Sequence, residues 1–379
     1  MYDIAIIGAG INGCSVAYEL TQAGKKVILI DMNSVAGGGS GAAGAFISPK
    51  FSKAGELKEL LHDAFIYSMD FYETNFPHLL KKAPLLHIAQ DKKDDATLQS
   101  YKKNSSLELL TPSQTVLKSL HDNAQIREHI SINAGVVDAQ NMCLAMAKSA
   151  QFVKHEVKNL LFDEGIWNID ELYSAKEVVL ATGAYEKLIK EPYIQLRGVW
   201  GHRIDVETTT QTNHSIHQFV SISPSEKGVL AIGATHNVHY HPQTSSENYH
   251  VESGREELLE KASKTLKLDN IKIVKDYMGL RSGSFDYMPL VGPLVISSET
   301  LQDKKINFKT KKPNFDEYTY YPNLTMINGS GGYGFVLAPY LAKILRDYIL
   351  QDKKINKRLT PARFFYRFAK KSFILNQTL

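Results

Sequence analysis

The hydrophobic positions at the start of the chain form two short apolar runs separated by a helical pattern. The first run covers residues 2–7 and leads directly into Gly8-Ala-Gly10-Ile-Asn-Gly13. The second run covers residues 27–30 and ends at Asp31. A strand, a Gly-x-Gly-x-x-Gly turn, a helix and a second strand ending on an acid are typical of a dinucleotide-binding βαβ unit. The pattern therefore predicts such a unit here.

Each residue of this motif has a physical reason to contact a dinucleotide. Gly8 makes the tight turn, Gly10 lets the backbone approach a pyrophosphate, and Gly13 lets the helix pack closely on the strand. The helix N-terminus faces the phosphate charge. Asp31 follows at the distance where an acid accepts hydrogen bonds from ribose hydroxyls. We therefore expect these four residues to bind the cofactor.

A Gly- and Ala-rich stretch over residues 34–49 follows the βαβ unit. It is either a flexible loop or a place where the backbone approaches a flat cofactor, because side chains would hold such a ligand away. The preceding motif favours the second interpretation, with Ser40 and Gly44 as cofactor contacts. The helical spacing of apolar residues from 57 to 72 then predicts an amphipathic helix that faces the core.

Two further glycine-rich turns lie far along the chain. An apolar strand that starts at residue 177 breaks at Ala181-Thr-Gly183, and a turn over residues 328–334 leads into an apolar helix from 336 to 349. The N-terminus of this helix carries partial positive charge, which suits a flavin ring that becomes anionic on reduction. A nicotinamide cofactor needs mainly the first motif, whereas FAD is longer, so the distribution favours FAD. The expected contacts in these turns are Ala181, Gly183, Gly329, Gly331, Gly332 and Gly334.

The order of elements predicts an α/β fold with a Rossmann-like FAD-binding domain interleaved with a mainly antiparallel-sheet substrate domain. Residues 196–240 alternate in the manner of antiparallel strands. We assign residues 1–83, 136–195 and 323–350 to the FAD-binding domain, and residues 84–135 and 196–322 to the substrate domain. The rest, 351–379, is a basic C-terminal tail. Within the substrate domain, the charged stretch 299–319 is expected to be an exposed insertion.

Composition excludes several other classes of protein. Hydrophobic residues make up 43% and charged residues 22% of the 379 residues, which are ordinary globular values. Two cysteines build no disulfide framework and have no metal-ligand spacing, so we expect a reducing, cytoplasmic setting. The chain shows no signal peptide and no run of apolar residues long enough to span a membrane. His236, His239 and His241 have no nearby cysteine, and we expect no metal.

These motifs, together with Gly279-Leu-Arg281 and Asp286-x-x-Pro289-x-x-Gly292, resemble the D-amino-acid oxidase and glycine oxidase superfamily. The resemblance covers nearly the whole chain and implies FAD and oxidation of a carbon–nitrogen bond by hydride transfer to the flavin. It also implies that Arg281 pairs with the substrate carboxylate, for which a planar guanidinium is well suited. The alternative is that Arg281 is a structural cation paired with Asp286. Because flavin amine oxidation can start from the neutral amine, no protein base is assigned, and His202 is expected to be structural or to line the pocket.

A closer resemblance links the chain to the oxidase domain of the MnmC family of bifunctional tRNA-modifying enzymes. It rests on residues 40–50, on Ile232-Gly-Ala-Thr with Tyr240, and on residues 359–371. It implies removal of the carboxymethyl group from 5-carboxymethylaminomethyl-(2-thio)uridine at the tRNA wobble position, with release of glyoxylate. Two alternatives are an oxidase or dehydrogenase of free glycine, sarcosine or D-amino acids, and a flavin-bearing RNA-binding protein without turnover.

The chain departs from this family in two ways. It has Ser-Gly-Ala-Ala at residues 40–43 where the family usually has Ser-Gly-Asn, which removes a polar side chain near the expected flavin. The FAD motif begins at residue 2, so we expect a stand-alone oxidase without the family's methyltransferase domain. Such an oxidase would depend on a separate tRNA methyltransferase.

The C-terminal tail gives an independent reason to expect an RNA partner. Residues 353–371 contain eight basic residues and no acid, with four aromatic residues interleaved. Basic groups can contact phosphates and aromatic rings can stack on exposed bases of the wobble loop. The alternatives are a solvated helix face with the aromatic residues in the core, or an amphipathic segment on anionic lipid. The run of lysines between 304 and 312 adds to the basic character.

Overall fold

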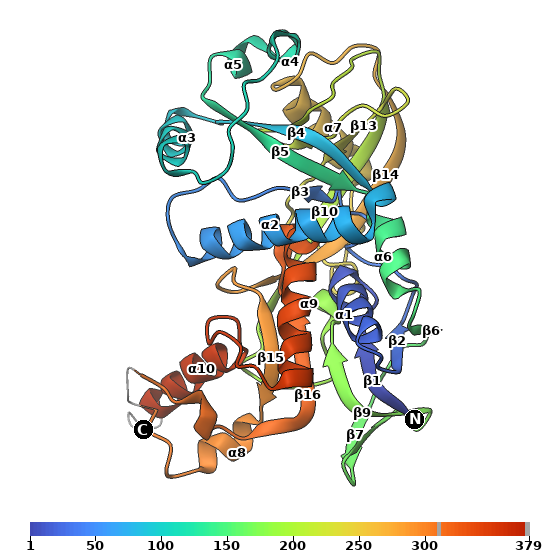
Figure 1. The fold of residues 1–379 in the computed structure, drawn as a ribbon, viewed down its shortest axis with the longest axis vertical. Helices are drawn as coiled ribbons and strands as arrows, with labels where there is room; N and C mark the ends of the chain where they lie inside the picture. Colours follow the sequence, from blue (N-terminus) through green and yellow to red (C-terminus); the bar gives the residue numbers. More distant parts are fainter. Residues whose placement is uncertain (309–311, 376–379) are drawn as a thin grey trace.

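Two eight-stranded sheets, placed one above the other in Figure 1, form the frame of the molecule. The structure is a computed structural model that describes residues 1–308 and 312–375. The lysine run predicted to add basic character therefore lies partly outside the described residues, as does the end of the basic tail. No helix in the described ranges is long and apolar enough to cross a membrane.

The first sheet is the predicted Rossmann-like unit. Its parallel strands, in spatial order, are β16 (Tyr320–Asn328), β9 (Tyr173–Leu180), β1 (Tyr2–Ile7), β2 (Val27–Asp31) and β6 (Gln151–Lys154). The antiparallel strand β15 (Leu290–Val295) lies at one edge, and the hairpin of β7 (Leu160–Asp163) and β8 (Ile166–Ile169) joins β9. The central strands are buried and almost wholly apolar because helices or loops cover both faces.

Four helices pack together beside this sheet, the first and the last of them directly against its strands. They are α1 (Ile11–Gln22), α2 (Glu56–Asn75), α6 (Ala139–Ala147) and α9 (Gly334–Gln351), and their apolar residues belong to one buried cluster. Tyr72 of α2 donates a hydrogen bond to the Phe335 carbonyl at 2.8 Å, which joins α2 to the first turn of α9. The predicted amphipathic helix over residues 57–72 is thus part of the core.

The second sheet is mainly antiparallel. Its strands, in spatial order, are β14 (Lys272–Ser284), β10 (Leu196–Glu207), β13 (Val229–Gly233), β12 (Ser221–Ile222), β11 (Ser215–His217), β4 (Leu80–Ile88), β5 (His129–Val137) and β3 (Phe46–Ile47). Helices α3 (Lys92–Asn104), α4 (Gln114–Ser119), α5 (Asp122–Gln125) and α7 (Val251–Ser263) accompany this sheet at the top of Figure 1. The fold class expected from the sequence is therefore present.

Individual strands cross the domain ranges that the sequence suggested. β15 pairs with β16 from Leu290↔Asn328 to Val295↔Tyr320, so it lies in the first sheet although its residues fall in the range assigned to the substrate domain. β3 pairs with β5 in the second sheet although its residues fall in the FAD-binding range. The polypeptide thus passes between the two sheets as often as the sequence ranges imply, but two of the passages come earlier in the chain, before β3 and before β15.

The charged stretch 299–319 is exposed over most of its described residues, as expected, but it is anchored by buried apolar side chains that the expectation left out. It contains α8 (Ser297–Gln302) and the short 3-10 helix η3 (Phe315–Glu317). Phe308, Phe315 and Tyr318 are buried there, and the Tyr318 ring lies 5.1 Å from that of Phe365. Apolar side chains within a charged sequence therefore form a small core beneath α10 (Ala362–Leu375).

A partly buried hydrogen-bond and ion-pair network joins α7 to the second sheet. Asp276 of β14 accepts a hydrogen bond from Arg255 Nε of α7 at 2.9 Å, and its Oδ1 lies 2.8 Å from Nε2 of His202. His202 on β10 is fully buried, so it is the structural residue that the sequence allowed. The hydrogen bonds from Arg255 and then from His202 lower the pKa of Asp276 to about 2, against the opposing effect of desolvation.

This network predicts a pH-dependent contribution to stability. The pKa of Asp276 is lower in the folded protein than the ~3.9 of an unfolded Asp. Its stabilising effect is therefore fully present above about pH 4 and is lost as the pH falls toward 2. Asp276→Asn should lower the free energy of unfolding by about 2 kcal/mol at pH 7, and this difference should shrink between pH 4 and pH 3.

Denaturant unfolding at several pH values measures this difference. Glu260→Gln, a change at an exposed carboxylate on α7, the helix that carries Arg255, is the matched control and should leave stability nearly unchanged. A deficit in Asp276→Asn that stays constant from pH 7 to pH 3 would contradict the assignment.

Candidate active site

A cavity of about 650 Å³ lies between the two sheets, within the size range of ligand pockets. The three glycine-rich elements and the 34–49 loop line it, although they are far apart in the sequence. Of the expected cofactor contacts, ten line the cavity: Gly8, Gly10, Asp31, Ser40, Gly44, Ala181, Gly183, Gly331, Gly332 and Gly334. Gly13 and Gly329 do not line it.

The glycines of the first motif allow very close packing at the end of β1. A Cβ on Gly8 would lie 2.2 Å from the Ala181 carbonyl oxygen, and one on Gly13 would lie 1.9 Å from the Gly8 carbonyl oxygen. Any side chain at either position would force β1, β9 and α1 apart. Gly13 thus allows the close packing behind the cavity without lining it. The N-terminus of α1 lines the cavity, and a helix N-terminus favours an anion.

Asp31 and Ser40 hold the turn around this helix start. The Asp31 carboxylate accepts a hydrogen bond from the Ala9 amide at 2.8 Å and one from the Asn33 amide at 2.8 Å. Ser40 Oγ accepts a hydrogen bond from the Ile11 amide at 2.9 Å. Both side chains therefore organise the loops of the site as well as lining the cavity.

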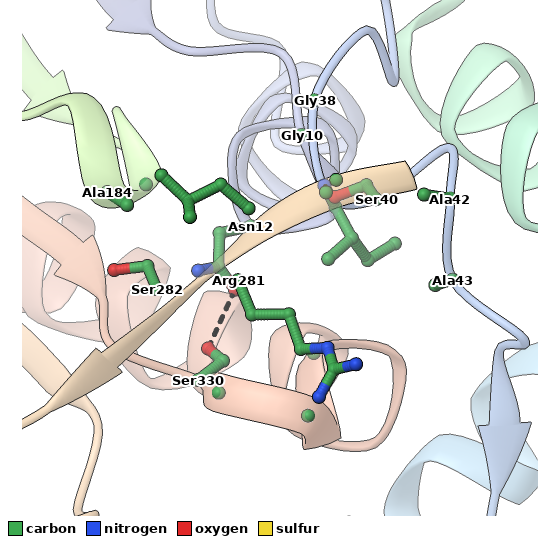
Figure 2. A pocket seen from close by; sticks show the side chains of 18 of the residues that line it. Gly10, Asn12, Gly38, Ser40, Ala42, Ala43, Ala184, Arg281, Ser282 and Ser330 are labelled. Atoms are coloured by element: carbon green, nitrogen blue, oxygen red, sulfur yellow. Dashed lines mark hydrogen bonds between the residues drawn. The ribbon is translucent and has the colours of Figure 1, made fainter. Parts of the chain in front are cut away.

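The other glycines leave room for a ligand. At Gly38, Gly183, Gly331 and Gly332, no atom of a described residue outside the local backbone lies within 4 Å of the point where a Cβ would stand. Ser330 Oγ donates a hydrogen bond to Asn12 Oδ1 at 3.1 Å, which ties the turn before α9 to α1 (Figure 2). A long cavity lined by open glycine backbone and two helix N-termini fits an extended dinucleotide such as FAD.

Arg281 enters the cavity from β14 and is held by backbone contacts. Its Nη2 donates a hydrogen bond to the Thr235 carbonyl at 2.7 Å. Gly201 on the neighbouring β10 provides the necessary space, because a Cβ there would lie 2.3 Å from Nη2 of Arg281. Figure 2 shows the side chain extending from β14, with Ala42 and Ala43 of the 34–49 loop on one side and Ser282 on the other.

The guanidinium of Arg281 forms no ion pair within the described residues. Asp286, the partner that the structural alternative required, binds Arg363 and Arg367 instead, at 3.0 and 3.4 Å. Desolvation by burial lowers the pKa of Arg281. Arg281 is partly buried, and a desolvated cation without a carboxylate partner is costly, so an anionic ligand group would offset that cost.

A second glycine pair brings the cofactor loop next to this arginine. A Cβ on Gly39 would lie 2.6 Å from the Leu280 carbonyl oxygen, and a Cβ on Gly279 would lie 2.8 Å from the Cα of Gly39. The 34–49 loop and β14 therefore touch through their backbones. The 34–49 loop and the Arg281 side chain therefore share one wall of the cavity.

The second sheet, which already provides Arg281 from β14, also lines the cavity through a row of residues in direct register. The row runs through His87 on β4, His217 on β11, Ser221 on β12, Gly233 on β13 and Arg203 on β10. All five line the cavity. Arg203 donates a hydrogen bond to the Ala43 carbonyl at 2.8 Å. No short sequence motif marks these residues as a set, because strand pairing brings them together.

The remaining histidine candidates lie elsewhere. His202 belongs to the Asp276 network and does not line the cavity, and neither do His236, His239 and His241. In the ranges that the structure describes, no group of three or more His, Cys, Asp or Glu residues is placed to hold a metal ion. The cavity therefore offers arginine and lysine cations, the carboxylates of Asp31 and Glu156, neutral polar groups and backbone amides, but no metal-binding cluster within the described residues.

Comparison of the chain with known proteins identifies a matching family and several relatives. A family model described as FAD dependent oxidoreductase (DAO) matches residues 3–348. The tRNA 5-methylaminomethyl-2-thiouridine biosynthesis bifunctional protein MnmC of Leptospira interrogans is 24% identical over 97% of this chain and 61% of its own length. The chain thus spans about three fifths of that relative. The glycine oxidase of Bacillus licheniformis is 25% identical over 77% of this chain and 84% of its own length.

A solved structure has the same fold. The glycine oxidase of Bacillus cereus superposes with a TM-score of 0.73 at 21% identity, over 93% of this chain and 96% of that one. At this identity the likeness concerns the fold alone. Because the family model covers most of the chain and the cavity fits its cofactor, the protein belongs to the DAO family of FAD-dependent oxidoreductases, which act on carbon–nitrogen bonds.

Proposed function

We propose that this protein oxidises the carboxymethylaminomethyl group of a modified uridine at the wobble position of tRNA. The N–CH2 carbon loses a hydride equivalent and the nitrogen loses a proton, which gives an imine. Addition of water and cleavage of the C–N bond then yield the 5-aminomethyl nucleoside and glyoxylate. The observation that carries the proposal is the unpaired Arg281 guanidinium in the cavity that suits FAD.

The residues of the chain have separate tasks in this proposal. Arg281 binds the substrate carboxylate through two parallel N–H···O bonds, and Gly201 and the Thr235 carbonyl fix the guanidinium that does so. Residues from both sheets enclose the reacting group and reduce its contact with water. FAD, when bound, supplies the acceptor for the two electrons. We assign no protein base, because oxidation can start from the neutral amine.

Two observations favour a tRNA substrate over a free amino acid. The MnmC relatives align over almost the entire chain, whereas the glycine oxidase relative aligns over 77% of it. The polar row on the second sheet also extends well beyond the reach of a molecule as small as glycine. A tRNA substrate would place the reaction in the cytoplasm. The primary amine that it produces would be the substrate of a separate tRNA methyltransferase.

A free-amino-acid oxidase is the second candidate. Glycine and the N-carboxymethyl group share the same N–CH2–COO⁻ unit, so one arginine serves both reactions. A flavin-bearing RNA-binding protein without turnover is the third. These candidates differ in which compound reduces the bound flavin.

The basic C-terminal segment, residues 353–371, includes part of α10 and supports RNA contact through only some of its basic residues. Phe364, Phe365 and Arg363 are buried, so for these residues the core alternative holds rather than base stacking. Lys353, Lys354 and Arg358 have acidic partners. Arg367 pairs with Asp286. The cations that remain include the partly exposed Lys370 and the exposed Lys371, and we propose that these contact tRNA phosphates.

The proposed reaction predicts a defined product pair. Holoenzyme incubated with tRNA that carries 5-carboxymethylaminomethyl-uridine should convert it to the 5-aminomethyl form and release an equal amount of glyoxylate. Nucleoside mass spectrometry and a glyoxylate assay measure the two products. Oxidation of glycine with unchanged tRNA would support the second candidate, and tRNA binding without any product would support the third.

Arg281 should control substrate binding without controlling cofactor binding. Arg281→Met removes two charge-assisted hydrogen bonds and should lower kcat/KM by roughly 100-fold or more, with FAD content unchanged. Gly201→Ala keeps the arginine but displaces its guanidinium, so it should lower kcat/KM in the same direction. Loss of FAD from Arg281→Met, or unaltered kinetics, would show that the residue has another role.

The outward cations of α10 should contribute to tRNA affinity in a salt-dependent way. The double variant Lys370→Glu, Lys371→Glu should weaken tRNA binding and reduce the slope of log K against log salt concentration by about one to two. Lys92→Glu, Lys93→Glu on α3, an exposed lysine pair at the opposite end of the molecule, is the matched control. Equal salt slopes for the α10 variant and the wild type would exclude phosphate contact by this helix.

A further inference from the structure

Two histidines in the wall of the cavity have no role in the reaction described so far. His87 on β4 and His217 on β11 are partners in parallel register, and their rings lie 6.4 Å apart. Both line the cavity. His87 Nδ1 and His217 Nε2 are buried and have no hydrogen-bond partner among the described residues. A buried polar nitrogen that lacks a partner costs free energy, which a ligand hydrogen bond would offset.

The protonation state of these histidines limits the kind of ligand they accept. Desolvation lowers the pKa of His87 to about 4 and that of His217 to about 3. Both imidazoles are therefore neutral at pH 7, and each offers one donor and one acceptor nitrogen. They suit a neutral polar group, whereas the guanidinium of Arg281 suits the carboxylate.

Aromatic rings give this part of the wall a flat shape. The Phe51 ring stacks on His87, with centroids 4.7 Å apart and planes 30° apart. The Phe46 ring meets His217 edge-on at 4.9 Å. Both phenylalanines also line the cavity. Flat apolar rings beside unpartnered ring nitrogens form a surface suited to a planar heterocycle with polar edges.

The position of the pair fits the far end of a substrate anchored at Arg281. Arg281 is held at the Thr235 carbonyl, just after β13, and His217 lies on β11, two strands farther along the sheet. At the usual spacing of neighbouring strands, that separation is about 10 Å. Free glycine cannot span this distance, but a modified nucleoside with its carboxylate on Arg281 can.

We infer that His87 and His217 form a specificity subsite that binds the pyrimidine base of the substrate through hydrogen bonds from and to neutral imidazole. This inference rests on the proposed function, because it assigns a place to the base that carries the oxidised group. It separates two tasks within one cavity. Arg281 recognises the carboxymethyl group, and the histidine pair recognises the ring to which that group is attached.

Kinetic analysis of holoenzyme variants tests this subsite, with 5-carboxymethylaminomethyl-uridine nucleoside and the corresponding tRNA as substrates. His87→Leu and His217→Leu should each raise KM for both substrates by roughly threefold to tenfold, with a smaller change in kcat. His87→Asn and His217→Gln retain a polar atom near Nδ1 and Nε2 respectively and should restore most of the affinity. His214→Leu, at a buried histidine outside the cavity, is the matched control.

The outcomes separate this inference from the function on which it depends. Wild-type enzyme that oxidises the tRNA substrate, with KM unchanged in both leucine variants, would overturn the subsite and leave the proposed function standing. Loss of FAD from the leucine variants would also overturn it, because the histidines would then hold the cofactor. If wild-type enzyme oxidises neither nucleoside nor tRNA, the proposed function and the subsite both fall.

Discussion

The site depends on a single electrostatic constraint, the partial burial and desolvation of the Arg281 guanidinium without a carboxylate partner in the described chain. The protein supplies one carbonyl acceptor, at Thr235, and a gap created by Gly201. The nearest expected acid, Asp286, is bound by arginines of the C-terminal segment. This arrangement keeps a desolvated cation ready for an anionic ligand, and burial strengthens its attraction to that ligand.

The rest of the architecture serves to place this cation beside a cofactor cradle. Backbone contacts at Gly8, Gly13, Gly39 and Gly279 bring β1, α1, the 34–49 loop and β14 closer together than side chains would allow. The Asn12–Ser330 hydrogen bond then connects the first and last glycine turns. The two sheets have different tasks, since the first organises the helix starts and the second presents polar side chains to the cavity.

The local parts of this arrangement could be predicted from the sequence. The residues that are brought together only by the register of distant strands could not. The βαβ unit and the glycine turns are visible because each needs a particular residue within a few positions. The His87–Arg203 row depends on the pairing of strands that are up to about 130 residues apart, so no short motif reveals it. The aromatic residues of the tail looked alike in the sequence, yet Phe364 and Phe365 are buried, because tertiary packing beneath α10 decides which face points inward.

The most direct test of substrate recognition by Arg281 is anaerobic reduction of the bound flavin, monitored as the loss of absorbance of the oxidised flavin. tRNA carrying 5-carboxymethylaminomethyl-uridine and free glycine are compared side by side at equal concentration of the N–CH2–COO⁻ group. If the carboxymethyl group of tRNA is the substrate, we expect rapid and complete flavin reduction by the modified tRNA. Reduction by glycine should be much slower, and tRNA that lacks the carboxymethyl group should not reduce the flavin. Rapid reduction by glycine together with an unreactive modified tRNA would contradict this expectation.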